Sequence, residues 1–491
     1  MAHWLPLAVL VPLVAGALTP AVARGRPALA RGWALSAALF STLATAMLTR
    51  RVAREGPFSY AMGGWAPPWG IELRFDEFSA AALFISFIVV LVLVFSGPYV
   101  LRAVPRPRIP WYYSLLLINL GAMIGFVVTG DLFNLFVFME LVAVSSYALV
   151  AVGGGRTAAL AAFKYLVAGA VSSTLILFCI GVLYAMTGSL NMADVALRLA
   201  EVEARAPVVL ALVGLVVGFL VKAGLFPLHV WLPDAHAIAP TPINALSSAL
   251  VVKLGIIGLL RVFPLFGAAG AVSLAPLYDA LAWLGAISIL ARAFFALFQQ
   301  DVTLMLAYST ISNIGYIVLG LGLAGELAVT GAGIHVLNHA LIKATLFLAA
   351  GAMLHQSGYR TLSDLRGVGH AMPWTSFSLL LGVLAIAGLP PTAGFLGKWY
   401  IALGAIQSGR PGFAVVVLLG ALLVFMYLGR MLNAFYFRAP THERMLAVRE
   451  APASMLGPVL LLAVLCVLGG LQGRWPVRLI EPAVVRLLGG G

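Results

Sequence analysis

Long apolar runs separated by short polar stretches follow one another along the chain. Most runs have a length of about 20 residues, which is what an α-helix needs to cross the hydrocarbon core of a bilayer. The pattern predicts an all-α polytopic membrane protein with about fourteen transmembrane helices. The predicted spans are residues 4–23, 32–49, 79–100, 111–129, 131–152, 158–186, 207–239, 241–263, 274–298, 302–323, 328–354, 373–407, 413–437 and 453–472.

Composition narrows the class of protein further. Hydrophobic residues make up 62% of the chain and charged residues only 10%, which excludes a soluble globular protein. The net charge of +13 comes from arginines scattered between the spans, so we expect membrane topology and no nucleic-acid partner. The first run lacks a basic leading region and a small-residue cleavage pattern, and we interpret it as a span rather than a signal peptide.

The arginines between spans predict the orientation in the membrane. Loops after odd-numbered spans hold more of them than the other loops, and positively charged loops tend to stay in the cytoplasm. With an even number of spans, both termini are expected outside the plasma membrane of a prokaryote, although Arg50, Arg51 and Arg54 lie on the other side. The loops after odd-numbered spans contain Arg24, Arg26, Arg31, Arg102, Arg106, Arg108, Arg156, Arg360, Arg366, Arg438, Arg444 and Arg449.

All five lysines lie inside or at the rim of apolar spans, whereas the loops use only arginine. A guanidinium stays charged, but an ammonium in a low-dielectric interior can release its proton. The alternative is that lysines near span ends extend their ammonium groups to the lipid headgroups. We interpret the distribution as a sign of proton transfer. The lysines are Lys164, Lys222, Lys253, Lys343 and Lys398.

Two predicted spans are too long and contain proline near their centres. Pro227 follows Lys222 in one, and Pro390 and Pro391 precede Lys398 in the other. Proline interrupts a helix and frees backbone groups, so each segment should be a broken helix. Paired broken helices are typical of transporters with inverted repeats and ion sites at the breaks. The alternative is that proline and glycine are simply frequent in membrane helices.

Lys222 and Lys398 each lie beside one of the two breaks, and the number of residues between them defines a step along the chain. Taken from Lys164, the same step leads to position 340, beside His339. Taken from Lys253, it leads to position 429, beside Arg430. We therefore expect ionisable groups to recur at similar places in two halves of the chain.

A third group of ionisable residues is His335, His339 and Lys343, spaced by four. This spacing puts all three on one face of a helix, in a stripe about 12 Å long. Histidine titrates near neutral pH, so bridging waters could pass a proton along the stripe. A metal site is the weaker interpretation, because no carboxylate or third ligand lies nearby and a lysine would repel the cation. We predict no metal ion and no cofactor.

Glu140 is the only acidic residue in the middle of a predicted span. A carboxylate among apolar side chains needs a cationic partner to stay ionised, and Lys222 is the natural candidate. Such a pair could open and close during proton transfer, or it could be a static structural ion pair. Asp131, at the start of the same span, is expected to cap a helix.

Four segments together resemble a known family. The strings DLFNLFVFMELVAVSSYALV, FPLHVWLPDAHAIAPTPINALSSALVVKLGIIGLLR, HVLNHALIKATLFLAAG and GLPPTAGFLGKWY are similar to the antiporter-like subunits of Mrp cation/proton antiporters, membrane-bound hydrogenases and respiratory complex I. Within that family the resemblance is strongest to the Mrp D subunits, through GDLFNLFVFME and the lysine at position 398. Complex I's middle subunit usually has a glutamate at that position.

The resemblance implies two inverted five-helix repeats, at residues 111–263 and 274–437. They would follow a three-helix segment, 1–110, and precede a C-terminal helix with a short tail, 438–491. It also implies roles for the ionisable residues: a first ion pair, a connecting lysine, a central axis and a distal lysine. In that order these are Glu140 with Lys222, Lys253, then His335, His339 and Lys343, and finally Lys398. We add Lys164, His229, Asp234, His236 and Arg430 as secondary candidates.

Two functions are open. The chain could be the proton/cation-translocating subunit of a multisubunit Na⁺/H⁺ antiporter, with H⁺ and Na⁺ as transported ions and other membrane subunits as partners. It could instead be a proton-pumping subunit of a redox complex, with the redox chemistry in partner subunits. The sequence has no glycine-rich nucleotide loop or cluster-binding cysteine motif. A stand-alone solute carrier is disfavoured, because the polar groups form a chain rather than one pocket.

Overall fold

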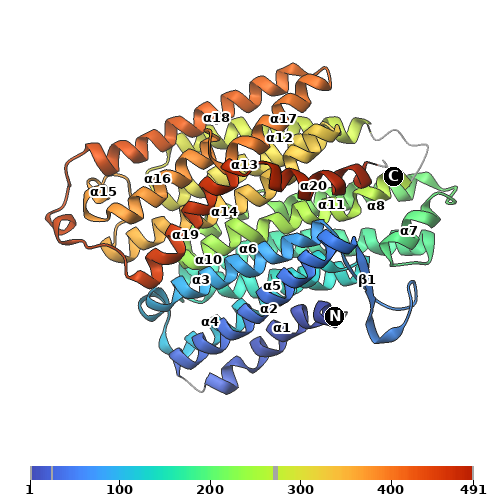
Figure 1. Ribbon diagram of the computed structural model, residues 1–491, viewed down its shortest axis with the longest axis horizontal. Coiled ribbons are helices and arrows are strands. Elements are labelled where there is room, and N and C mark those ends of the chain that lie inside the picture. The colour runs from blue at the N-terminus through green and yellow to red at the C-terminus, as the bar shows by residue number, and fades with distance from the viewer. Residues whose placement is uncertain (1–2, 24–25, 269–274, 489–491) are drawn as a thin grey trace.

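The computed structural model describes residues 3–23, 26–268 and 275–488. These residues form a bundle of helices whose long axes run in broadly similar directions (Figure 1). Thirteen helices in the described part are long and apolar enough to cross a membrane. The remaining predicted span, residues 373–407, is two shorter helices separated by a break. The chain is therefore an all-α polytopic protein.

The N-terminal segment consists of three long helices and a small hairpin. Their bounds are α1 (Trp4–Ala23), α2 (Pro27–Glu55), β1 (Phe58–Ala61), β2 (Glu72–Phe75) and α3 (Ala81–Ala103). The two strands are antiparallel, with Phe58 opposite Phe75. Helix α1 packs against α4 of the next group, where Gly16 permits a close approach to Ser114 and Ile118.

The first central group contains one broken span. Its elements are α4 (Ile109–Val128), α5 (Leu132–Ala151), α6 (Arg156–Thr187), α7 (Met192–Leu199), α8 (Arg205–Ala223), α9 (Trp231–Ile238), α10 (Thr241–Leu246), the π-helical turn η4 (Ser247–Val251) and α11 (Val252–Ala268). Helix α8 ends at Gly224, whose φ of 67° is left-handed and suits glycine. A turn containing Pro227 then leads into α9.

The second central group has the same plan. Its elements are α12 (Ala275–Phe298), α13 (Val302–Gly322), α14 (Glu326–Ser357), α15 (Val368–Ala371), α16 (Pro373–Ala387), α17 (Ala393–Gln407), α18 (Pro411–Leu432) and η5 (Asn433–Phe437). Helix α16 ends at Gly388, which has a φ of 83°, and Pro390 and Pro391 separate it from α17. Both broken spans therefore end their first half at a left-handed glycine, followed by proline.

Each central group has an isolated β-bridge beside the start of its second helix, at Asp131 in the first group and at Asp301 in the second. Asp131 bridges Asn191 beside the start of α5, and Asp301 bridges Thr361 beside the start of α13. Both aspartates cap their helices. The start of α13 and the loop that follows α5 line the same cavity, so these two helices run in opposite directions. The step from Asp131 to Asp301 is shorter than the step from Lys222 to Lys398.

Two further helices follow the second group, α19 (Ala453–Leu471) and α20 (Arg474–Leu487). The tail expected after the last span is thus largely helical. Helix α20 packs against α14 and α11. Gly333 makes the contact with α14 possible, because a Cβ there would lie 2.6 Å from Cγ2 of Ile480.

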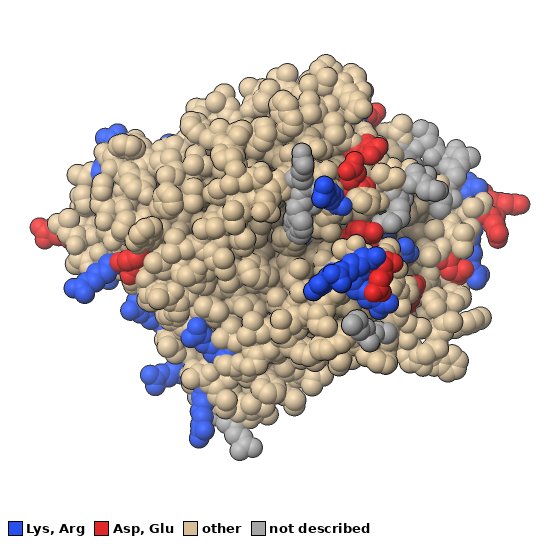
Figure 2. Space-filling view, viewed as in Figure 1, with Lys and Arg blue, Asp and Glu red and all other residues tan. Residues whose placement is uncertain are grey.

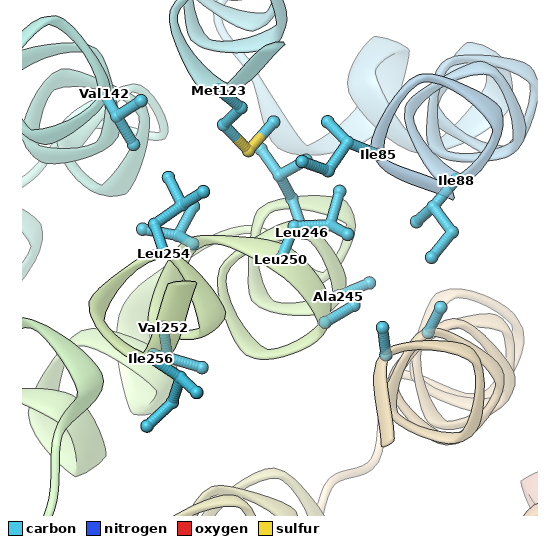
Figure 3. Close-up of a cluster of buried hydrophobic side chains, with 14 of the residues drawn as sticks. Ile85, Ile88, Met123, Val142, Ala245, Leu246, Leu250, Val252, Leu254 and Ile256 are labelled. Atoms are coloured by element: carbon cyan, nitrogen blue, oxygen red, sulfur yellow. The ribbon is translucent and has the colours of Figure 1, made fainter. Parts of the chain in front are cut away.

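Helices of the N-terminal segment and the first group share one apolar core. In Figure 3, side chains from α3, α4 and α5 lie along one side of the α10–η4–α11 segment, with Ile85 and Met123 near Leu246. All three of these side chains are at most 3% exposed. Helix α14 is the most enclosed span, since its apolar window is 100% buried. Charged side chains on the visible face gather toward the two ends of the bundle (Figure 2).

Candidate functional site: a row of buried ionisable residues

The first member of the row is Glu140 on α5. Its Oε1 lies 3.4 Å from Nζ of Lys222, which is in the last turn of α8. Oε1 also accepts a hydrogen bond from the Ser173 hydroxyl on α6. The Glu140 side chain is 32% exposed and that of Lys222 only 11%. The pairing is the one expected from the sequence, and the carboxylate end of it reaches the surface of the chain.

Lys253 follows on α11, directly after the π-helical turn η4. The ammonium of Lys253 donates a hydrogen bond to the carbonyl of Ser248 in this turn. The Ser248 hydroxyl lies 2.7 Å from that of Thr310 on α13. Gly255 of α11 packs closely on Ala223, the residue that follows Lys222 in α8. The contact between Ser248 and Thr310 links the first group to the second.

The central helix α14 carries His335, His339 and Lys343, each 0% exposed. The two imidazole rings are parallel, with centroids 5.6 Å apart. Lys343 donates hydrogen bonds to the Leu306 carbonyl at 2.9 Å and to the Ser309 hydroxyl at 2.7 Å. All three residues therefore lie on one face of α14, as their spacing predicted.

The histidines have unused hydrogen-bonding atoms. Nε2 of His335 lies 3.2 Å from Oδ1 of Asn313. Nδ1 of His335 and both ring nitrogens of His339 are buried without a hydrogen-bond partner among the described residues. A buried polar atom needs a partner, and ordered water commonly supplies it. This stretch of the row therefore suits water-bridged proton transfer.

Lys398, on α17, is the last member of the row. Its Nζ donates a hydrogen bond to the Ile386 carbonyl at 2.6 Å, across the break between α16 and α17. The same atom lies 4.5 Å from the centre of the Tyr316 ring, which is 5.8 Å from the His335 ring. His339 interacts electrostatically with Lys253, Lys343 and Lys398. The Tyr316 ring therefore lies between the Lys398 ammonium and the His335 ring.

The secondary candidates are less closely connected to the row. Lys164 and Asp234 form an ion pair of 2.6 Å with half-exposed side chains. His229 is buried beside the Phe226 ring in the first break. Arg430 lines a separate cavity of about 280 Å³ together with Arg366 and Arg438. His236 is buried next to Phe347, one turn from Lys343.

Sequence reasoning missed the neutral partners of the row. Ser173, Ser309, Thr310, Asn313 and Tyr316 all contact its members or their partners. Four of them lie close together on α13, and this cluster of polar residues in an apolar span was the available signal. Among the described residues, no group of three or more His, Cys, Asp or Glu side chains could hold a metal ion.

Comparisons with known sequences cover most of the chain. Residues 129–424 match a protein family described as NADH:quinone oxidoreductase/Mrp antiporter, TM. The chain is 39% identical over 484 residues to NADH-quinone oxidoreductase subunit N of Desulforudis audaxviator, covering 96% of each chain. It is 30% identical over 490 residues to the D subunit of a Na(+)/H(+) antiporter of Bacillus subtilis, covering 99% of this chain and 98% of the relative.

Solved structures share the fold along the whole length. A chain of the membrane-bound sulfane sulfur reductase, an archaeal respiratory membrane complex, matches with a TM-score of 0.91 and 31% identity, covering 99% of each chain. A chain of the Mrp complex from Dietzia sp. DQ12-45-1b matches with a TM-score of 0.90, covering 100% of this chain and 98% of the other. The identity in the second case is 23%, so that likeness concerns the fold alone.

Proposed function

Since this chain belongs to the NADH:quinone oxidoreductase/Mrp antiporter family of membrane proteins, we propose that it is a proton/cation-translocating subunit of a multisubunit Na⁺/H⁺ antiporter. Its partners are other membrane subunits of that complex. The observation that carries the proposal is the row of ionisable residues from Glu140 to Lys398, which crosses both central groups. Ionisable side chains inside a membrane protein are costly, and by default they mark an ion or proton path.

Protons move along this row in steps. When the Glu140–Lys222 pair is closed, the carboxylate stabilises the charged ammonium. When the pair opens, Lys222 loses that attraction and releases its proton toward Lys253. Lys343, the two histidines of α14 and Lys398 then pass charge through bridging waters. Each lysine already has a carbonyl, hydroxyl or carboxylate partner, so the charged form is solvated at every stop.

The two central groups act as inverted repeats in this proposal, at about residues 111–263 and 274–437. Two observations support it: the equivalent bridges at Asp131 and Asp301, and the opposite directions of α5 and α13. The repeats differ in chemistry. Thr310 follows Glu140 by the same number of residues as Asp301 follows Asp131, so Thr310 takes the position of Glu140 in the second repeat. By the same count, Lys343 takes the position of Ser173. One repeat therefore carries the acid and the other a buried base.

The chain resides in a prokaryotic plasma membrane in this proposal, with both termini outside. The arginines of the loops after odd-numbered spans then lie in the cytoplasm. Two of these loops line the same cavity, one through Ala103 at its beginning and the other through Arg360. They therefore lie at the same end of the bundle. We refer to this end as the arginine-rich face.

A second candidate function is proton pumping in a redox complex. The 39% identity to a quinone oxidoreductase subunit favours it, as does the match to a respiratory membrane complex. Purifying the chain with its native partners and identifying them separates the two candidates. Iron–sulfur or flavin subunits would indicate redox coupling, whereas only small membrane subunits would indicate exchange.

Ion flux in inverted vesicles tests the proposal directly. Vesicles containing the assembled complex should show Na⁺-dependent collapse of a pH gradient, and Glu140→Gln should abolish it. Normal flux in Glu140→Gln vesicles with normal levels of the complex would contradict the proposal. Proton pumping driven by an electron donor, without a Na⁺ requirement, would favour the second candidate.

A further inference from the structure

A cavity of about 280 Å³ lies where the loop that follows α14 meets the end of α18. Three arginines line it, Arg366, Arg430 and Arg438, and none of its described lining residues is acidic. Arg366 is in the same loop as Arg360, so the cavity opens at the arginine-rich face. None of the three guanidiniums forms a hydrogen bond or an ion pair with a described residue. The cavity therefore gathers positive charge that the described part of the chain does not neutralise.

The carboxylates near this cavity along the chain already have partners. Asp364 accepts a hydrogen bond from the Thr361 hydroxyl at 2.5 Å and lies 3.1 Å from Nε2 of His442. Asp301 pairs with Arg360 at 2.9 Å. Three guanidiniums in one small cavity repel one another, and an anion between them removes that repulsion. Because a guanidinium presents a planar fork of N–H donors that matches phosphate oxygens, the cavity suits a phosphate group.

Hydrogen bonds hold the walls of the cavity in place. The N–H of Gly367 donates to the Ala434 carbonyl at 3.1 Å, and the Thr441 hydroxyl donates to the Ser363 carbonyl at 2.8 Å. Both bonds join the loop after α14 to the end of the α18 segment. A site that is formed before binding loses less conformational freedom when its ligand enters. Pockets for drug-sized ligands usually measure about 300–1,000 Å³, so this smaller cavity fits a headgroup better than a nucleotide.

An apolar stripe leads along α18 to the cavity. Leu422, Met426 and Arg430 follow one another at intervals of four, which places them on one face of the helix. Leu422 is 56% exposed, Met426 is 48% exposed, and Phe437 at the end of η5 is 81% exposed. Helix α18 forms one edge of the bundle (Figure 1), so the stripe faces outward. Acyl chains along the stripe and a phosphate among the guanidiniums belong together in one molecule, a phospholipid.

We propose that this cavity binds the phosphate of an anionic phospholipid from the leaflet at the arginine-rich face, with the acyl chains lying along α18. Basic pockets between membrane helices bind such headgroups. The three guanidiniums neutralise the phosphate, and the amides of Gln300 and Asn433 donate to the other headgroup oxygens. The bound lipid thereby ties the loop after α14 to the end of α18. The proposal goes beyond ion transport and applies to an antiporter and to a redox complex alike.

Lipid titration of the purified full-length chain in neutral detergent tests the site. Native mass spectrometry should show that phosphatidylglycerol binds about tenfold more tightly than phosphatidylcholine, whose choline group cancels the phosphate charge. Replacing all three cavity arginines by glutamine should remove this preference. The matched control replaces three exposed arginines outside this cavity by glutamine, namely Arg106, Arg444 and Arg449. An unchanged preference in the cavity variant, or an equal loss in the control, would overturn the site.

A single substitution and a soluble anion complete the titration. Arg438→Gln changes only an exposed side chain, so the fold should be kept while binding of phosphatidylglycerol weakens several-fold. Inorganic phosphate should bind at least tenfold more weakly than the lipid, because it does not contact the apolar stripe. Equal affinities for inorganic phosphate and phosphatidylglycerol would indicate an anion site without a lipid and would overturn the proposal.

Photo-crosslinking in native membranes identifies what occupies the cavity in the assembled complex. Asn433→benzoylphenylalanine places a photoreactive group at an exposed position of the cavity wall, and irradiation should give a phospholipid adduct. An adduct to another subunit, or the absence of a lipid adduct, would overturn the proposal. Lipid binding is measured without ion flux, so the result does not depend on the outcome for Glu140→Gln, and the lipid site and the proposed function fail separately.

Discussion

The ammonium of Lys398 lies 4.5 Å from the centre of the Tyr316 ring and 2.6 Å from the Ile386 carbonyl oxygen. Ile386 is in the last turn of α16, so its carbonyl lacks a helical donor because the break follows. The Tyr316 hydroxyl donates to the Val417 carbonyl at 3.2 Å, which fixes the ring under the ammonium. The broken helix therefore creates the acceptor that holds the buried cation, and the neighbouring helix supplies a π face.

Replacing this lysine by arginine should stop transport although the charge is kept. Lys398→Arg places a guanidinium that cannot release its proton, and we expect at least a tenfold loss of flux. Lys222→Arg should behave in the same way. Arg410→Lys is the matched control, because Arg410 pairs with Asp279 at an exposed site. If both Lys→Arg variants exchange ions normally, the two lysines are electrostatic anchors rather than proton carriers.

Glu140→Gln should abolish Na⁺-dependent proton flux with little loss of assembly. The amide can keep a hydrogen bond to Ser173 but cannot stabilise the charged Lys222 ammonium. Asp234→Asn is the matched control, since it removes a carboxylate from an ion pair whose side chains are about half exposed. Flux is measured in inverted vesicles, and the level of complex by blotting. Equal losses of flux in both variants would argue against a specific role for Glu140.

The contact between α14 and α17 should be intolerant of larger side chains. A Cβ at Gly397 would lie 2.9 Å from Cβ of His335, and one at Gly331 would lie 2.8 Å from the backbone nitrogen of Ile401. Small residues allow this close approach of two membrane helices. Gly397→Val should push Lys398 away from the row and reduce flux more than it reduces assembly. Gly412→Val is the control, because a Cβ there meets nothing within 4 Å.

An ion pair between the segment that precedes α3 and helix α11 should make stability depend on pH. Asp76 precedes α3 and pairs with Arg261, which also donates to the Val127 carbonyl. Burial raises the pKa of Asp76, but attraction to Arg261 and hydrogen bonds from Arg261 and Ser79 outweigh it, so the pKa lies below its ordinary value of 3.8.

A lowered pKa means that the carboxylate stabilises the fold above pH 3.8 and loses this effect as the pH falls through the lower folded value. Asp76→Asn should cost about 3 kcal/mol at neutral pH, because it leaves a buried guanidinium unpaired. Thermal unfolding in detergent, followed from pH 7 to pH 3, should show the difference between wild type and variant shrinking only at the acid end. A constant difference across that range would contradict this assignment.

The sequence by itself determined the class of protein, the spans and most of the ionisable residues of the row. Runs of apolar residues and the spacing of His335, His339 and Lys343 are local properties, since one helix fixes which residues share a face. The two breaks were also local, because proline and a left-handed glycine interrupt a helix wherever it lies. The pairing of Glu140 with Lys222 was predicted from charge alone, because the apolar spans offer a carboxylate few other cationic partners.

Only the tertiary structure decided which neutral groups solvate the buried cations. Ser309 and Tyr316 reach Lys343 and Lys398 because α13 packs against α14 and α17, and no spacing along the chain encodes that contact. The same holds for the cavity at the arginine-rich face, whose walls bring the end of α3 together with the loop after α14. The β-bridges at Asp131 and Asp301 likewise depend on which segments lie side by side in the fold and not on the spacing of lysines along the chain.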